Sequence, residues 1–189
     1  MRRRRLQLAV VVGVLGLMGV VAAAVAGDGN RNVREHLTGY EEVAASPNPS
    51  TISTSGTGDF KARVRSDRIE YRLTYGGLEG DVLQAHIHLG ARAIAGGISV
   101  FLCTNLTNAP AGRNTPACPG TRDGTVSGTL EPADVIGPAG QGIAPGEYEE
   151  LLRAIRAGAT YANVHTSKYP AGEIRAQLND DDDGHHDRD

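Results

Sequence analysis

Apolar and polar residues alternate in short segments along most of the chain from residue 54 to residue 178. In residues 60–65 the side chains of Phe60, Ala62 and Val64 share one face, and residues 69–75 alternate in the same way. A period of two is typical of half-buried β-strands, and the short polar turn between these two segments predicts a hairpin. Further strands are expected at residues 36–43, 82–89, 97–103, 124–130, 159–166 and 173–178.

One segment has a helical period instead. Tyr148, Leu151, Leu152 and Ile155 recur at the spacing of one helix face, and Gly158 follows where a helix commonly ends. The chain contains 25 glycines and no tryptophan, a composition more common in all-β proteins than in helical bundles. We therefore predict an all-β fold, an antiparallel β-sandwich or Greek-key barrel of about eight strands, with one short helix that closes one end.

The first 26 residues have the pattern of an export signal. Arginines at residues 2–5 precede an apolar run that ends in Ala24-Val25-Ala26. Small residues at these positions predict a signal peptide at 1–26, followed by a linker at 27–35 and a β domain at 36–178. The protein is then secreted, periplasmic or on the cell surface. The alternative is an uncleaved membrane anchor, because the run is long enough to span a bilayer.

The charges are concentrated at the two ends of the chain. Residues 179–189 contain six aspartates and are expected to form a disordered acidic tail. The body between the ends is nearly neutral, and aromatic residues make up only 4 % of the chain. Both features argue against nucleic-acid binding. The expected partner is an unidentified ligand or surface outside the cytoplasm, and a membrane only if the N-terminal segment stays attached.

Both cysteines of the chain, Cys103 and Cys118, lie in the predicted exported body. An even number of cysteines in an oxidising compartment indicates a disulfide, here around a loop rich in Asn, Pro, Gly and Thr. Two free thiols are the alternative.

Three of the predicted strands contain polar residues on the face opposite their apolar side chains. If these strands are neighbours in the sheet, the polar side chains form one cluster. The candidates are His86, His88, Asn163, His165, Glu173 and Arg175.

Two chemistries fit this cluster. His86, His88 and His165, with Glu173 as a ligand or an orienting group, could hold one zinc or copper ion. The alternative is a hydrogen-bonded network, with Asn163 and Arg175 among its members, that holds the strands in register. No cofactor is certain from the pattern. The body has too few histidines for a dinuclear copper/zinc centre, so superoxide dismutase chemistry is not expected.

The same segments resemble the CHRD domain, which is named for chordin. Among them are the motifs His86-Ile87-His88 and Asn163-Val164-His165-Thr166, and the resemblance extends over about residues 36–178. It implies a secreted all-β domain without an established catalytic activity and assigns no ligand. We therefore expect a non-enzymatic exported module with a binding or structural role, and a mononuclear zinc or copper protein is the alternative. The segments that carry the resemblance are 37–43, 85–90, 96–103, 157–166 and 170–177.

Overall fold

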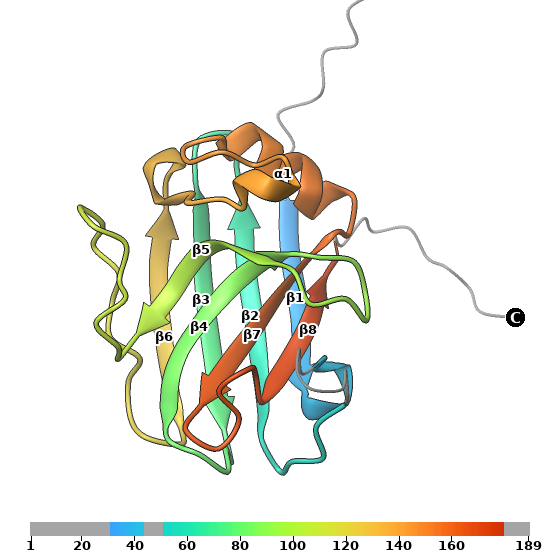
Figure 1. Cartoon of the computed structure of the whole chain (residues 1–189), viewed down its shortest axis with the longest axis vertical. Helices are drawn as coiled ribbons and strands as arrows, with labels where there is room; N and C mark the ends of the chain where they lie inside the picture. The colour runs from blue at the N-terminus through green and yellow to red at the C-terminus, as the bar shows by residue number, and fades with distance from the viewer. Residues whose placement is uncertain (1–30, 44–50, 180–189) are drawn as a thin grey trace, which may run out of the picture.

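The computed structural model describes residues 31–43 and 51–179. In this part of the chain eight antiparallel strands form one sheet with the order β5-β4-β7-β8-β1-β2-β3-β6, which curls into a nearly closed barrel (Figure 1). The predicted all-β class is confirmed. The strands are β1 (Arg31–Thr38), β2 (Thr57–Val64), β3 (Ile69–Gly76), β4 (Val82–Leu89), β5 (Gly97–Thr104), β6 (Gly124–Leu130), β7 (Thr160–Thr166) and β8 (Ile174–Leu178).

The edge strands β5 and β6 face each other across the seam of the barrel, and Tyr71 of β3 bridges this seam. Its hydroxyl donates a hydrogen bond to the Leu102 carbonyl of β5, with an O···O distance of 2.5 Å. The ring can reach across because its neighbour in β6 is Gly128, where a Cβ would lie 2.8 Å from the ring. The apolar faces of the strands then enclose one continuous core inside the barrel.

The helix α1 (Tyr148–Arg156) covers one end of the barrel, as its amphipathic pattern predicts (Figure 1). Leu151, Leu152 and Ile155 are buried in the core, whereas Arg153 and Arg156 are exposed to solvent. Within the described residues, no helix has the length and apolar character needed to cross a bilayer. Three short 3-10 helices complete the structure: η1 (Gly39–Glu41), η2 (Pro132–Asp134) and η3 (Ala139–Gln141).

The first strand lies earlier in the chain than expected. β1 begins at Arg31, inside the segment expected to be a linker, and residues 39–41 form η1 instead of continuing the strand. The apolar residues of β1, Val33 and Leu37, are four positions apart and both are buried. β1 pairs with β2 over its whole length. This pairing makes the segment a strand, although its apolar and polar residues do not alternate.

The predicted disulfide is confirmed. Cys103, at the end of β5, is bonded to Cys118 in the long connection to β6. The expected signal segment lies outside the described residues, as does the acidic tail from residue 180 onward.

Candidate metal centre

The candidate histidines lie on the outer face of the neighbouring strands β4 and β7, next to β8. Across β4 and β7, Asn163 is the register partner of His86, and Tyr161 is that of His88. Across β7 and β8, Asn163 is opposite Arg175. The strands that alternation marks as polar on one face are therefore adjacent, and their polar side chains share one side of the sheet.

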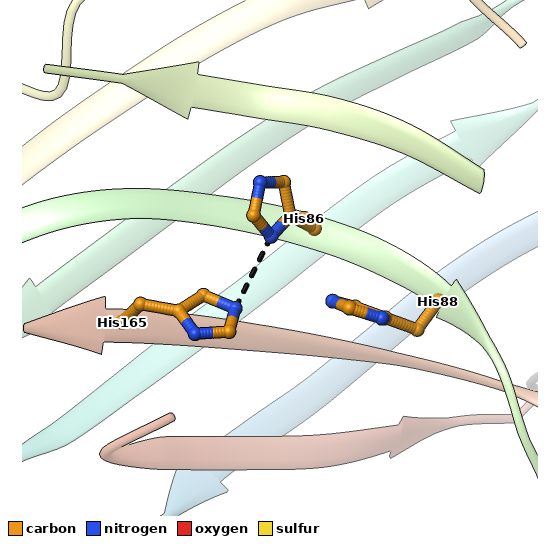
Figure 2. Close-up of side chains that lie close together, drawn as sticks. All are labelled: His86, His88 and His165. Carbon is orange, nitrogen blue, oxygen red and sulfur yellow. Dashed lines mark hydrogen bonds between the residues drawn. The ribbon is translucent and has the colours of Figure 1, made fainter. Parts of the chain in front are cut away.

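Three imidazole rings converge on this face. His86, His88 and His165 each offer a ring nitrogen, and these nitrogens all lie within 4.8 Å of one another. His86 Nδ1 and His165 Nε2 are 3.1 Å apart, and Figure 2 shows a ring nitrogen of His88 pointing toward this pair. The structure thus brings His86, His88 and His165 together on one face.

Backbone carbonyls determine which nitrogen carries the hydrogen in two of the rings. His88 Nδ1 lies 2.9 Å from the Gly96 carbonyl, and His165 Nδ1 lies 3.0 Å from the Pro170 carbonyl. A carbonyl only accepts, so both Nδ1 atoms donate, and each neutral ring has its lone pair on Nε2. His86 Nδ1 then donates to His165 Nε2 in the metal-free protein.

The three rings are neutral over the physiological pH range. All are buried, with 0 % of His86 and 7 % of both His88 and His165 exposed. Burial lowers the pKa of His86 to about 2, with a smaller effect from the other two histidines. Burial also lowers the pKa values of His88 and His165 to about 4, against the effect of their hydrogen bonds to backbone carbonyls. Neutral imidazole is the form that binds metals.

Two of the ring nitrogens are left without a partner. His86 Nε2 and His88 Nε2 are both buried and make no hydrogen bond of ordinary geometry among the described residues, although the Asn163 side chain lies near enough to His88 to raise its pKa slightly against the effect of burial. A buried polar atom without a partner is uncommon and costs free energy. The histidines alone therefore form an incomplete hydrogen-bonded network.

Aromatic and cationic groups hold two of the rings in place. The His88 ring stacks on Tyr161, with ring centroids 4.8 Å apart and planes 5° apart. On Tyr161 also lies the guanidinium of Arg175, 3.4 Å from the ring centroid. Phe101 of β5 contacts His86 in an edge arrangement with centroids 4.3 Å apart. These contacts restrict the rotation of both rings, as the surroundings of a preorganised ligand do.

The loop between β4 and β5 covers this face and explains why so many polar side chains are buried. Arg175 donates hydrogen bonds to the carbonyls of Ala91 and Ile94, and Gln177 donates to the carbonyl of Gly90. The outer face of β4, β7 and β8 is therefore a second, polar interior, separate from the apolar core. Arg175 and Asn163, the expected network residues, both belong to it.

Glu173, the fourth candidate ligand, does not join the cluster. Its carboxylate accepts hydrogen bonds from the hydroxyls of Thr54 and Thr166 and from the backbone N–H of Glu79, at 2.6–2.8 Å. Glu173 lies just before β8, where the chain turns, so the alternation of the strand does not determine its direction. The close approach of this carboxylate to Gly56 places it toward the end of the barrel.

Glu42 is a polar residue of this region that sequence reasoning missed. It is 2 % exposed, and its carboxylate accepts hydrogen bonds from the Val43 N–H at 2.9 Å and from Asn163 Nδ2 at 3.5 Å. Burial raises the pKa of Glu42. In the sequence it follows Glu41 in a segment without alternation, so no local signal distinguishes the buried carboxylate from the partly exposed one.

Comparison with known proteins identifies the family. The model of the CHRD domain matches residues 33–178, which include every strand except the first two residues of β1 and also include the three histidines. Neither a curated protein nor a solved structure matches the chain. The chain therefore belongs to the CHRD domain family, whose domains are generally non-enzymatic.

Proposed function

We propose that this CHRD domain is an exported, non-enzymatic binding module whose ligand is one transition-metal ion, zinc or copper(II), held by His86, His88 and His165. The observation that carries the proposal is the convergence of three buried, neutral imidazoles whose hydrogen-bonding potential is not satisfied. Two of the rings already donate Nδ1–H to a backbone carbonyl, which is how ligating histidines are usually oriented.

One nitrogen–nitrogen distance in the cluster suits a metal ion as well as it suits a hydrogen bond, and the three nitrogens, which lie within 4.8 Å of one another, would draw closer around an ion. Two nitrogens bound to one tetrahedral zinc ion at about 2.0–2.1 Å are roughly 3.4 Å apart, close to the 3.1 Å between His86 Nδ1 and His165 Nε2. A bound ion would replace the hydrogen between these atoms, and His86 would carry its hydrogen on Nε2. The His88 nitrogen, which lacks a partner, would become the third ligand.

Imidazole ligands suit both proposed ions. Zinc and copper(II) accept three histidines and leave a coordination position for water, and copper(II) binds more tightly at most sites of this kind. Export is supported by the arginine-led apolar segment and its Ala24-Val25-Ala26 ending. The disulfide between Cys103 and Cys118 is compatible with an oxidising compartment.

Metal titration of the tag-free apo-protein tests the proposal. We expect binding of one zinc or copper(II) ion per chain, weakened at least tenfold by His86→Ala, His88→Ala or His165→Ala, because each change removes one ligand. His36→Ala is the matched control, since this exposed histidine pairs with Asp59 and is not one of the three converging residues, so its loss should not affect the affinity. Isothermal calorimetry and metal analysis after gel filtration provide the measurement.

Two results would contradict the metal site. One is the absence of stoichiometric binding to the wild-type protein. The other is binding that persists in the triple histidine variant and disappears only when residues 180–189, with His185 and His186, are deleted.

A further inference from the structure

A divalent ion bound by neutral histidines would bring two positive charges into a site that already contains a buried cation. Arg175 is 1 % exposed and lies on the Tyr161 ring, which in turn stacks on His88. After burial, the main cause, the charge of Arg175 contributes to the lowered pKa of His88. Its field therefore reaches this ring. Charge that is buried without compensation costs free energy, so a negative group nearby would strengthen the binding of a divalent ion.

Two carboxylates in the described part of the chain are more than nine-tenths buried, Glu42 and Glu173. Glu173 is fully engaged, because it accepts three short hydrogen bonds away from the histidines. Glu42 accepts one hydrogen bond of ordinary length, from its neighbour Val43, and a longer one from Asn163. Arg175 donates to backbone carbonyls and to Gln177, and no hydrogen bond joins it to Glu42. The charge of Arg175 acts on Glu42 without a hydrogen bond between them, and Glu42 is the buried carboxylate that accepts fewer and longer hydrogen bonds.

The turn between β7 and β8 leaves room for the Glu42 carboxylate. Gly172 in this turn has a φ of +134°, which side-chain-bearing residues rarely adopt, and a Cβ there would lie 2.3 Å from Glu42 Oε2. A glycine is therefore required at this position for the carboxylate to reach Asn163.

Asn163 lies between this carboxylate and the histidines. It is the register partner of His86 and shares a strand face with His165, two residues away on β7. Its Nδ2 group donates to Glu42, whereas its Oδ1 atom is buried without a hydrogen-bond partner. An amide in this position can accept a hydrogen bond from a water molecule on the metal and link that water to the carboxylate.

We propose that Glu42, acting through Asn163, is the counter-charge of the metal centre and makes it selective for divalent over monovalent ions. This inference rests on the proposed metal-binding function. The other charged groups facing the region are Arg175, on β8, and the exposed ion pair of Arg92 with Glu41, whose charges cancel. Glu42→Gln keeps the shape of the side chain and removes its negative charge. The affinity for Cu²⁺ then falls more than the affinity for Cu⁺, because the more highly charged ion depends more on the carboxylate.

The test compares the two copper oxidation states in the full-length protein. We expect Glu42→Gln to lower the affinity for Cu²⁺ about tenfold relative to Cu⁺, which equals a rise of about 59 mV in the midpoint potential of the one-electron couple. Glu42→Asp keeps the charge and should leave the potential near the wild-type value. Glu173→Gln is the matched control, since it removes the other buried carboxylate and should lower the melting temperature without a comparable rise in potential.

A second variant tests whether the charge itself matters. The double variant Asn163→Asp, Glu42→Gln has one carboxylate, closer to the histidines, so its copper potential should return toward the wild-type value. Asn163→Asp alone is not used, because its carboxylate would lie beside that of Glu42 and the two would share a proton. The double variant also keeps one carboxylate in the site if Glu42→Gln alone does not fold.

The outcomes separate the two proposals. Wild-type protein that binds no metal overturns the metal function itself. If the wild type binds copper, the counter-charge is overturned by an unchanged potential in Glu42→Gln, by an equal rise in Glu173→Gln, or by a double variant Asn163→Asp, Glu42→Gln whose potential stays at the value of Glu42→Gln.

Discussion

The surroundings of His88 differ at its two ring nitrogens. Its Nδ1 donates to the Gly96 carbonyl, its ring stacks on Tyr161, and its Nε2 is buried without a partner. The unpaired nitrogen costs free energy in the metal-free protein, and in the proposed metal site it would be the ligand atom of a ring that is already held in place. The histidine cluster therefore also determines how the apo-protein responds to acid.

We predict that the metal-free protein loses stability as the pH falls from about 6.5 toward 4. The pKa values of His88 and His165 are lowered to about 4 in the folded state, so the unfolded chain binds more protons in this window and unfolding is favoured. One such ring contributes a loss of about 2 kcal/mol between pH 7 and pH 5. Urea denaturation at both pH values measures the difference.

The matched comparison for this acid effect is His88→Gln against His36→Gln. The first should reduce the pH dependence by about 2 kcal/mol, because one buried ring is removed. The second changes an exposed histidine and should leave the dependence as it is in the wild type. An equal effect of the two variants would show that the buried histidines do not cause the pH dependence of stability.

At the scale of elements, the connection from β5 to β6 has no regular pattern of apolar residues, and a disulfide and side-chain hydrogen bonds fix its position. The disulfide joins Cys103 to Cys118, and the side chain of Asn105 donates to the Val82 and Cys118 carbonyls while accepting from the Cys118 N–H. Sequence reasoning predicted the cysteine pair from the count and the compartment. The anchoring role of Asn105 depends on the position of β4, which is remote in sequence.

We predict that the double variant Cys103→Ser, Cys118→Ser has a free energy of unfolding about 3 kcal/mol lower than the wild type. The two cysteines are separated by 15 residues. Without the disulfide the unfolded chain gains conformational entropy, which lowers its free energy by about 3 kcal/mol for a loop of this size. Denaturation without reductant measures the loss. Reductant should lower the stability of the wild type similarly and leave the variant unchanged, whereas identical unfolding midpoints for wild type and variant would contradict the prediction.

At the scale of the whole molecule, the chain combines a barrel with an N-terminal segment that predicts export. The described structure begins with β1 at Arg31, and the family match begins at residue 33. Both lie just after the predicted cleavage point at Ala26, so removal of the signal would leave the matched domain intact.

We predict that the mature protein begins at Gly27. N-terminal sequencing of protein isolated from its native cells measures this directly. Ala24→Glu should block processing, because a charged residue replaces the small residue three positions before the cleavage point, while Ala23→Glu is the neighbouring control and should still be processed. A wild-type chain that starts at Met1 and fractionates with membranes would instead indicate an uncleaved anchor.

Local pattern in the sequence was sufficient for most elements and for the faces of the strands. Alternation predicted the hairpin of β2 and β3 and the strands that contain the histidines, and helical spacing predicted α1, because both periods are properties of the backbone itself. The same alternation grouped His86 with His88, and His165 with Asn163. The first strand was placed too late, at residues 36–43 and not at Arg31–Thr38, because the order of this segment depends on pairing with β2.

Only the tertiary structure decided what these faces contact. The sheet closes with β4 next to β7 and β7 next to β8, which brings His86 to within 3.1 Å of His165 across 79 residues of sequence. Closure also directs Glu173 away from the cluster and brings Glu42 to Asn163. Strand period is local, whereas strand neighbours, covering loops and the burial of a polar face depend on contacts between distant segments. The sequence by itself therefore determined most of the strands and the polar residues on their outer faces, and the closing of the barrel decided which of these residues meet.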